Sequence, residues 1–313
     1  MSRRGWIAFA LLSVIWGVPY LFIRIAVRGG VPPLPLAWAR VTMAAVILLT
    51  LAWRAGVLGG IRGRARAIAG YAVAEVVIPF SLISAGEQHI SSSLAAILIA
   101  AVPLFVVLLA LRFDHAERPT PLRALGLGLG FAGVVALVGI DVSGHASELL
   151  ASAGLLVAAF GYACGPMIIK HWLVGADARA TMGSSLAVAS LLLTPLAALT
   201  WPSRSPTAGA LASVAVLGVV CTALAFVILP VLVAEAGPSR TSVITYINPV
   251  VAVALGVTLL GERPGAGAVA GLALILGGSW LSTGGPAAAR PALGAGGPIS
   301  AARSGTRRSC RAG

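Results

Sequence analysis

The chain has 313 residues, of which 58% are apolar and only 10% are charged, and its formal net charge is +13. An ordinary soluble domain carries roughly 25% charged residues, so this composition excludes a water-soluble core as the main architecture. A basic charge would suit a nucleic-acid partner. The positions of the Lys and Arg residues indicate membrane topology instead, so we expect the lipid bilayer and no nucleic acid as partner.

Ten apolar stretches follow one another along the chain, each close to the ~20 residues that a helix needs to cross a 30 Å hydrocarbon layer. Ala, Leu and Gly dominate them and strand-like alternation is weak, which favours helices over barrel strands. The predicted fold is therefore an all-α integral membrane protein with ten transmembrane helices. Their expected limits are 6–26, 35–53, 67–86, 91–111, 122–140, 149–169, 180–200, 208–233, 241–260 and 266–283.

The distribution of positive charge predicts the orientation of these helices. With the N-terminus placed in the cytoplasm, 17 of the 22 Lys and Arg residues lie on the inner side and 3 on the outer side. Positive residues resist translocation, so both termini are expected in the cytoplasm of a multi-pass protein in the inner, or plasma, membrane.

The second half of the chain repeats landmarks of the first. Pro103, Glu117-Arg118-Pro119, Gly126 and Gly133 have counterparts in Pro249, Glu262-Arg263-Pro264, Gly271 and Gly278, and all but the prolines keep an offset of 145 residues. Because five helices per repeat is an odd number, the second half enters the membrane from the other side. The sequence therefore predicts two inverted five-helix repeats.

Three domains follow from this pattern: a first repeat over 1–141, a second over 142–284, and a disordered basic cytoplasmic tail over 285–313. Gly126-x-x-x-Gly130 and Gly267-x-x-x-Gly271 permit close helix packing. We expect that contact between the halves or between protomers, so a homodimer is one possibility left open.

Several of these pieces together resemble the EamA-type, ten-helix branch of the drug/metabolite transporter superfamily. The matching pieces are Trp16-Gly17 with Arg24, Arg40 in span two, Pro103-Leu104-Phe105 before Glu117-Arg118-Pro119, and Asn248-Pro249-Val250 before Gly261-Glu262-Arg263. They cover residues 6 to about 283. The resemblance implies a secondary transporter of small organic solutes, often an exporter, without naming the solute.

Glu75 is the most costly residue of the predicted spans. It lies ~12 Å from the inner edge of span three, where a charge costs at least ~2.5–3.5 kcal/mol unless it is paired or neutralised. The preferred interpretation is a carboxylate that takes up a coupling proton or binds a cationic part of the solute. The alternative is a protonated side chain that hydrogen-bonds to a neighbouring helix.

Arg40 and a group of aromatic residues are further candidates for binding. Arg40, ~8 Å inside span two, could hold a carboxylate or phosphate, or could extend toward the outer headgroups. Trp16 and Tyr20, one turn apart in span one, could stack on a solute or simply pack.

Span nine contains a further group of candidates. Tyr246 and Asn248 precede Pro249, and proline removes a backbone donor. Pro249 and Pro103 are therefore expected to interrupt their helices near a binding site, or only to bend them.

Motifs of several enzyme classes are absent. Lys170 is the only lysine and no glycine-rich phosphate loop surrounds it, and no nucleophile or metal set stands out. We therefore expect no enzyme activity, cofactor or metal, and predict a secondary transporter of metabolite, amino-acid-like or drug-like solutes, an exporter that works by alternating access. The alternatives are a non-transporting sensor or assembly subunit and a lipid-modifying membrane enzyme.

Overall fold

The computed structural model describes residues 2–113, 120–141, 145–236, 241 and 243–283, and every regular element in these ranges is helical. The predicted tail and the Glu117-Arg118-Pro119 turn lie outside them. The α-helices are α1 (Arg3–Gly17), α2 (Pro19–Arg28), α3 (Pro33–Arg54), α4 (Ala65–Tyr71), α5 (Ile78–Gly86), α6 (Ser92–Ile99), α7 (Val102–Phe113), α8 (Pro121–Asp141), α9 (Ala146–Trp172), α10 (Ala178–Leu199), α11 (Ala208–Gly218), α12 (Ala225–Ala236), α14 (Ile244–Leu260) and α15 (Ala266–Ser282).

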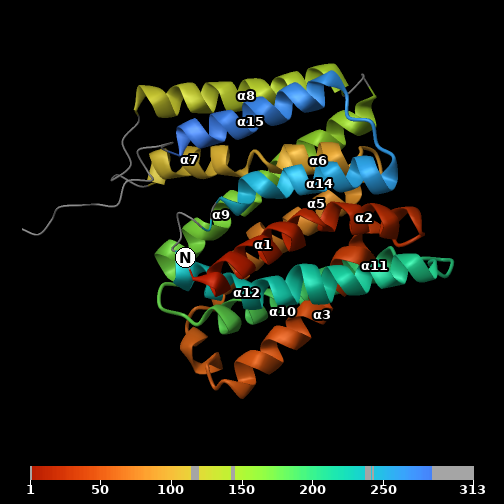
Figure 1. Ribbon diagram of the computed structural model, residues 1–313. Coiled ribbons are helices and arrows are strands. Elements are labelled where there is room, and N and C mark those ends of the chain that lie inside the picture. The colour runs from red at the N-terminus through yellow and green to blue at the C-terminus, as the bar shows by residue number, and fades with distance from the viewer. Residues whose placement is uncertain (1, 114–119, 142–144, 237–240, 242, 284–313) are drawn as a thin grey trace, which may run out of the picture.

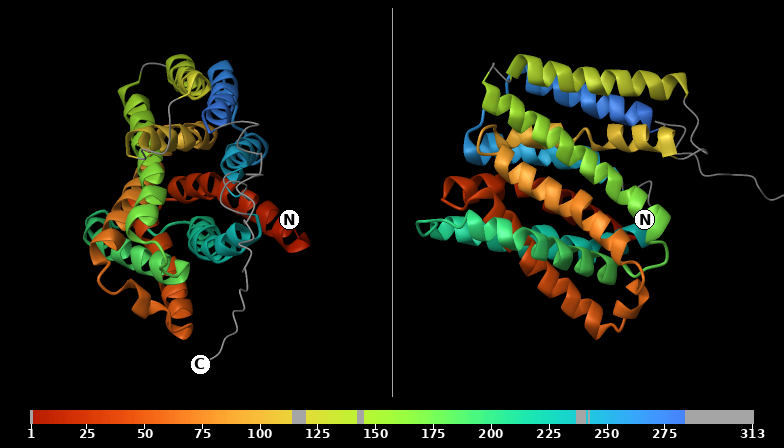
Figure 2. Two further views of the ribbon diagram at one scale, coloured as in Figure 1. Left: turned by 90° about the vertical axis from the view of Figure 1, so that its left-hand side faces the viewer. Right: turned by 180° about the vertical axis from the view of Figure 1, so that it is seen from behind.

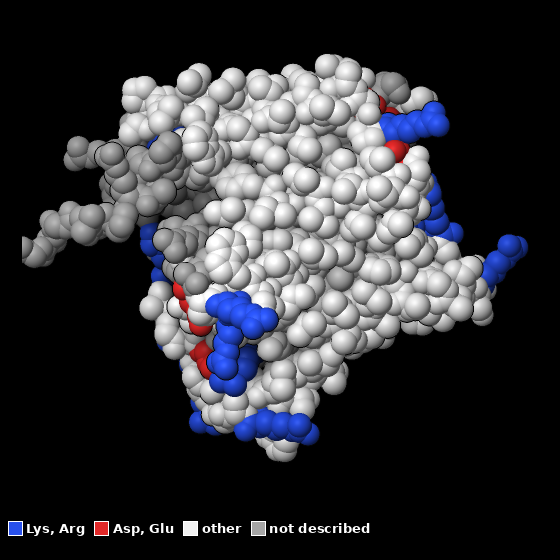
Figure 3. All heavy atoms as spheres, viewed as in Figure 1, with Lys and Arg blue, Asp and Glu red and all other residues white. Residues whose placement is uncertain are grey.

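These helices join into ten spans, which confirms the predicted fold class. Eight spans have 21 to 29 residues and are apolar enough to cross a membrane. The other two, α14 and α15, have 17 residues each, at the lower limit for a hydrocarbon layer of about 30 Å. On the side of the molecule seen in Figure 3, charged residues gather at the two ends of the bundle and a band without charged residues lies between them.

The two ends of the bundle are named here by the helices that begin there. Helices α1, α4 and α8 begin at the N-terminal face, on the left of Figure 1, and α6, α9 and α11 begin at the opposite face. Seen from either side, α8 and α15 form one outer layer and α3 with α10 another, with the remaining helices between them (Figure 2). The cavity described below lies in this middle region.

The contact between α8 and α15 has the symmetry expected of inverted repeats. The two helices are antiparallel, and a Cβ placed on Gly126 would lie 2.7 Å from the carbonyl oxygen of Gly278. A Cβ placed on Gly133 would lie 3.0 Å from the carbonyl oxygen of Gly271. Gly126 corresponds to Gly271 in the repeat, and Gly133 corresponds to Gly278. The Gly126–Gly278 and Gly133–Gly271 contacts are therefore equivalent, as a two-fold axis requires. The glycine motifs thus join the two halves of one chain.

The pair α3 and α10 repeats this exchange at the other side of the bundle. Trp38 Nε1 donates a hydrogen bond to Thr194 Oγ1 (3.0 Å), and a Cβ on Gly183 would lie 3.1 Å from the backbone of Leu48 and Leu49. With the offset of 145 residues, Gly183 corresponds to Trp38 and Thr194 to Leu49. Two independent helix pairs therefore share one symmetry.

Four spans are irregular near their middle. Span one breaks at Val18, before Pro19, and span four breaks between Ile99 and Val102. Spans three and eight contain the π-helical segments η2 (Ala72–Val77) and η3 (Val219–Leu224). In span three Pro79 follows η2 closely and offers no N–H to the carbonyl of Glu75, so one bond of the regular helix is absent where the turn widens.

The two predicted helix interruptions differ. In span four the chain leaves the helix just before Pro103, which lies in the first turn of α7, a position that proline tolerates. In span nine α14 continues through Pro249. There the Asn248 amide, oriented so that Nδ2 donates, bonds the Ile244 carbonyl at 3.0 Å and so supports the turn that the proline weakens.

Candidate functional site

A cavity of about 380 Å³ lies among the central spans, within the range of small-molecule sites. Its wall is mostly apolar and aromatic, and a few polar side chains converge on it. Five of the six predicted binding residues line it, from spans one, two, three and nine: Trp16, Tyr20, Arg40, Glu75 and Asn248. Both predicted proline positions, Pro103 and Pro249, also border the cavity.

Tyr246 is the predicted binding residue that the structure places elsewhere. Its hydroxyl lies 3.0 Å from Thr283 Oγ1, beside the end of α15. Its neighbour Thr245 lines the cavity instead. The residue that lines the cavity is therefore the one before the predicted residue. Adjacent side chains on a helix point about 100° apart, so only one of the two faces the cavity.

Arg40 is buried inside the protein, and two contacts fix its guanidinium. Its side chain is 8% exposed, its Nε donates a hydrogen bond to Thr222 Oγ1 at 2.8 Å, and its Cζ lies 4.0 Å from the centroid of the Phe80 ring. The Thr222 hydroxyl donates in turn to the Leu217 carbonyl at 2.8 Å, so it can only accept from Arg40. The terminal nitrogens of a guanidinium fixed in this way form a fork suited to a carboxylate.

Glu75 lies in the π-helical segment η2 and its Oε2 is buried without a hydrogen-bond partner among the described residues. The carboxylate lies directly against Gly165 of α9, where a Cβ would overlap Oε2. No ion pair joins Glu75 and Arg40 within the described parts of the chain, so both groups remain for other partners.

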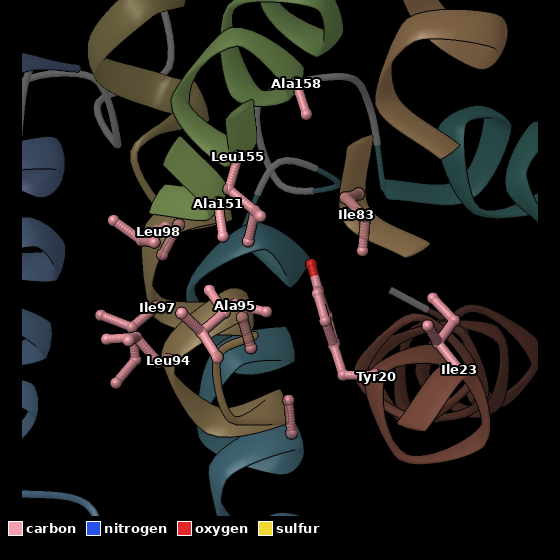
Figure 4. Close-up of a cluster of buried hydrophobic side chains, with 14 of the residues drawn as sticks. Tyr20, Ile23, Ile83, Leu94, Ala95, Ile97, Leu98, Ala151, Leu155 and Ala158 are labelled. Atoms are coloured by element: carbon pink, nitrogen blue, oxygen red, sulfur yellow. The ribbon is translucent and has the colours of Figure 1, made fainter. Parts of the chain in front are cut away.

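The aromatic residues of span one have different surroundings. Trp16 packs edge-on against Phe226 of α12, with ring centroids 6.5 Å apart. Tyr20 is 8% exposed and belongs to the buried cluster shown in Figure 4. There its hydroxyl points into the space between α2 and the helices around it, with Ile83 and Leu155 nearby. Both rings can therefore contact a solute and also support the packing of the wall.

Several lining residues were missed by the sequence argument: Tyr71, Phe80, Tyr162, Cys221 and Thr222. Tyr71 lies one helical turn before Glu75, and Tyr162 follows the Phe160-Gly161 pair that corresponds to Trp16-Gly17. Thr222 and Cys221 lie in η3, one and two residues before Ala223, the position that corresponds to Glu75 in the repeat. Tyr71 was detectable from its distance along the helix to Glu75, and Tyr162, Cys221 and Thr222 from their positions in the repeat.

The two ends of the cavity differ in exposure. Toward the N-terminal face its wall includes Pro166, which is exposed, and Ile169, Leu229 and Thr245, which are partly exposed. Toward the opposite face the wall ends at Ile83, and beyond it Ile90 and Leu94 are 3% and 8% exposed. The cavity is therefore closed on the opposite face and extends toward the N-terminal face.

Polar contacts reinforce this closure. Glu262, between α14 and α15, accepts hydrogen bonds from the backbone N–H groups of Ser92 (2.8 Å) and Ser93 (2.9 Å) and from the Ser93 hydroxyl (2.5 Å). Burial works to raise the pKa of the Glu262 carboxyl, but the hydrogen bonds from Ser93 and Ser92 outweigh it and hold the pKa below its usual value. An ionised Glu262 thus caps the N-terminus of α6 from the other half of the chain.

Arg24 acts at the same face rather than in the cavity. Its Nη1 donates to the carbonyl oxygens of Glu87 and Ile90, the latter at 3.1 Å. The guanidinium holds the turn that connects α5 to α6.

Comparison with known proteins agrees with this architecture. The profile of the EamA-like transporter family matches residues 3–139 and 149–284. A solved crystal structure covers 90% of the chain and 98% of its own with a TM-score of 0.65, and at 21% identity it supports the fold alone.

Three relatives carry names that bear on transport. The uncharacterized inner membrane transporter YedA of Escherichia coli K12 is 30% identical over 262 residues, 82% of each chain. A probable terminal-alkyne amino-acid exporter of Streptantibioticus cattleyicolor is 30% identical over 292 residues, 90% of this chain and 93% of its own. A probable amino-acid metabolite efflux pump of E. coli K12 is 26% identical over 274 residues, 84% of this chain and 89% of its own. The chain therefore belongs to the EamA-like transporter family of the drug/metabolite transporter superfamily, and it is a multi-pass membrane protein.

Proposed function

We propose that this protein is a secondary transporter that exports small amino-acid-like solutes by alternating access. The observation that carries the proposal is the meeting of Arg40 and Glu75 in one largely apolar cavity. A solute with a carboxylate and an ammonium group would find a partner of opposite charge for each, and the aromatic wall would hold its side chain. The names of two relatives, an amino-acid exporter and an amino-acid metabolite efflux pump, support this substrate class.

The orientation we propose places the N-terminal face in the cytoplasm. Among the described residues, ten Lys and Arg lie at that face and three at the opposite face, as expected from the resistance of positive charge to translocation. The three are Arg28, Arg204 and Arg263, and the ten are Arg3, Arg4, Arg54, Arg62, Arg64, Arg66, Arg112, Arg123, Lys170 and Arg179. In this orientation the cavity extends toward the cytoplasm and is closed to the outside, so an exporter would load its solute in this conformation.

The two-fold relation between the halves supports alternating access. The two repeats, 1–141 and 142–284 in our division, contact each other through symmetric helix pairs, and rocking of one half against the other exchanges the open and closed ends. Glu75 is the proposed site of a coupling proton. A carboxyl group that faces the cavity can exchange a proton for the ammonium group of a solute as the protein alternates.

The test is transport by purified protein in liposomes. Vesicles loaded with radiolabelled amino acids should release the substrate when a pH gradient is imposed, and an unlabelled substrate on the other side should accelerate the exchange. Topology is checked separately: Ser205→Cys should react with an impermeant maleimide from outside intact cells, and Gly59→Cys only after permeabilisation. Absence of release or exchange for every amino acid and amino-acid derivative in the panel would refute the proposed function.

A further inference from the structure

The turn after α5 contains a buried carboxyl group that the transport cycle described above does not use. Glu87 is 0% exposed, and neither of its carboxylate oxygens has a hydrogen-bond partner among the described residues. Arg24 is adjacent, but it donates to the backbone carbonyl of Glu87 and not to its carboxylate. Burial of an unpaired carboxylate is costly, and the usual solution is protonation.

The repeat supplies a counterpart with the opposite environment. Glu87 at the end of span three corresponds to Glu235 at the end of span eight, with an offset of 148 residues shared by Gly70 and Gly218. Glu235 lies at the N-terminal face, is exposed, and accepts a hydrogen bond of 2.6 Å from Ser2 Oγ. The carboxyl group at the closed face is thus buried, and its counterpart toward the open end is exposed.

The charged and titratable groups around Glu87 come from several elements. Arg24 and Tyr20 belong to α2, Arg40 to α3, and Glu262 to the connection before α15. His89, in the same turn, is exposed. Burial raises the pKa of the Glu87 carboxyl well above its usual range, Arg24 and Arg40 oppose this, and Glu262 adds to it.

We infer that Glu87 is a second proton site, which takes up a proton whenever the opposite face closes and releases it to the same side when that face opens. This inference rests on the alternating access of the proposed function. Two protons then have different roles. The proton at Glu75 is exchanged for solute in the cavity, and the proton at Glu87 makes closure of the opposite face depend on the pH of the outer medium. No proton crosses the membrane through Glu87.

The sign of the effect follows from linkage. The closed state binds the Glu87 proton more tightly than the open state, so its extra stability is complete below the ordinary carboxyl pKa of roughly 4.3 and is lost as external pH rises through the raised value. Between these limits the ratio of open to closed molecules should rise by up to tenfold per pH unit, the slope for one proton. Alkaline external medium should therefore open the opposite face.

The experiment measures opening directly. In a chain without its native cysteines, Ile90→Cys reports exposure of the buried cluster to an impermeant maleimide in right-side-out vesicles at fixed internal pH. Its rate is divided by that of Ser205→Cys, an exposed position on the same face, to remove the pH dependence of the thiol itself. We expect the normalised rate to rise with external pH, to stay low and constant with Glu87→Gln, and to keep its slope with the matched control Glu235→Gln.

Three results would overturn the inference: a pH-independent rate in the parent chain, an unchanged slope with Glu87→Gln, or rapid labelling of Glu87→Gln at every pH. The last would mean that an ionised Glu87 holds the face closed through Arg24. Failure of the proposed function is distinguishable, because labelling needs no transport. Loss of solute release with pH-dependent labelling intact would refute export alone.

Discussion

Replacement of Arg40 tests how the cavity would recognise a carboxylate. Its Nε is already bonded to Thr222, which leaves the two terminal nitrogens to form a pair of bonds with a solute. Charge-assisted hydrogen bonds contribute about 1.5–3 kcal/mol each, so Arg40→Met should cost about 3–6 kcal/mol of binding free energy. At 1.4 kcal/mol per factor of ten, the Kd should rise at least ~100-fold. Arg40→Lys, which retains the charge without the fork, should raise the Kd by about 10- to 100-fold.

The assay compares a transported amino acid with its carboxamide in a double-mutant cycle. Kd is measured by calorimetry on the purified protein, and the thermal stability of each variant without solute shows whether the fold is intact. Arg28→Met is the matched control, because Arg28 is exposed at the opposite face. If Arg40→Met weakens the acid and the amide by the same factor, Arg40 does not contact the carboxylate and this account of recognition fails.

Three further changes test other parts of the account. Glu75→Gln should retain solute exchange but abolish release driven by a pH gradient; if gradient-driven release persists, the coupling proton is not at Glu75. Glu262→Gln should weaken the closed state by about 1–3 kcal/mol through lost hydrogen bonds to Ser92 and Ser93, and should speed maleimide labelling of Ile90→Cys. In the parent chain, ionised Glu262 should stabilise the closed state fully above the ordinary carboxyl pKa, and this stabilisation should be lost as pH falls through the lowered pKa of Glu262. Labelling of Ile90→Cys that becomes slower on acidification below that pKa would contradict this prediction. Gly133→Val should separate α8 from α15 and cost about 1–3 kcal/mol, seen as a lower Tm, whereas Gly128→Val, where a Cβ meets open space, should not.

Much of this architecture was predictable because the membrane imposes it. Helix length and apolarity are set by the hydrocarbon thickness, so all ten spans were found, with limits that differ from the observed helices by a few residues. The duplicated glycine motifs predicted close packing of the fifth and tenth spans, α8 and α15, because their glycines occupy equivalent positions in the two halves. Several candidate cavity residues could be predicted because a charge or a proline inside a membrane span is energetically unfavourable and is usually present for a function.

The remaining features depend on which side of each helix points into the cavity, and sequence position alone specifies this poorly. Tyr246 and Thr245 are adjacent, yet only Thr245 lines the cavity, because the orientation of α14 is set by its packing on α1 through Asn248 and Ser13. The partner of Arg40 could not be foreseen either. Thr222 comes from the other half of the chain, 182 residues away, and its hydroxyl is directed by a bond to its own helix.

The widened turns in spans three and eight constrain how these spans can change. Each accommodates one residue more than an α-helical turn of the same height, so the helix beyond it is rotated by about 100° relative to a regular continuation. Deletion of one residue within Val219–Leu224 would leave an apolar helix of nearly the same length, yet would swing Phe226 and Leu229 away from the cavity. Length variation in these two segments should therefore alter what the wall presents to a solute while the protein still inserts and folds.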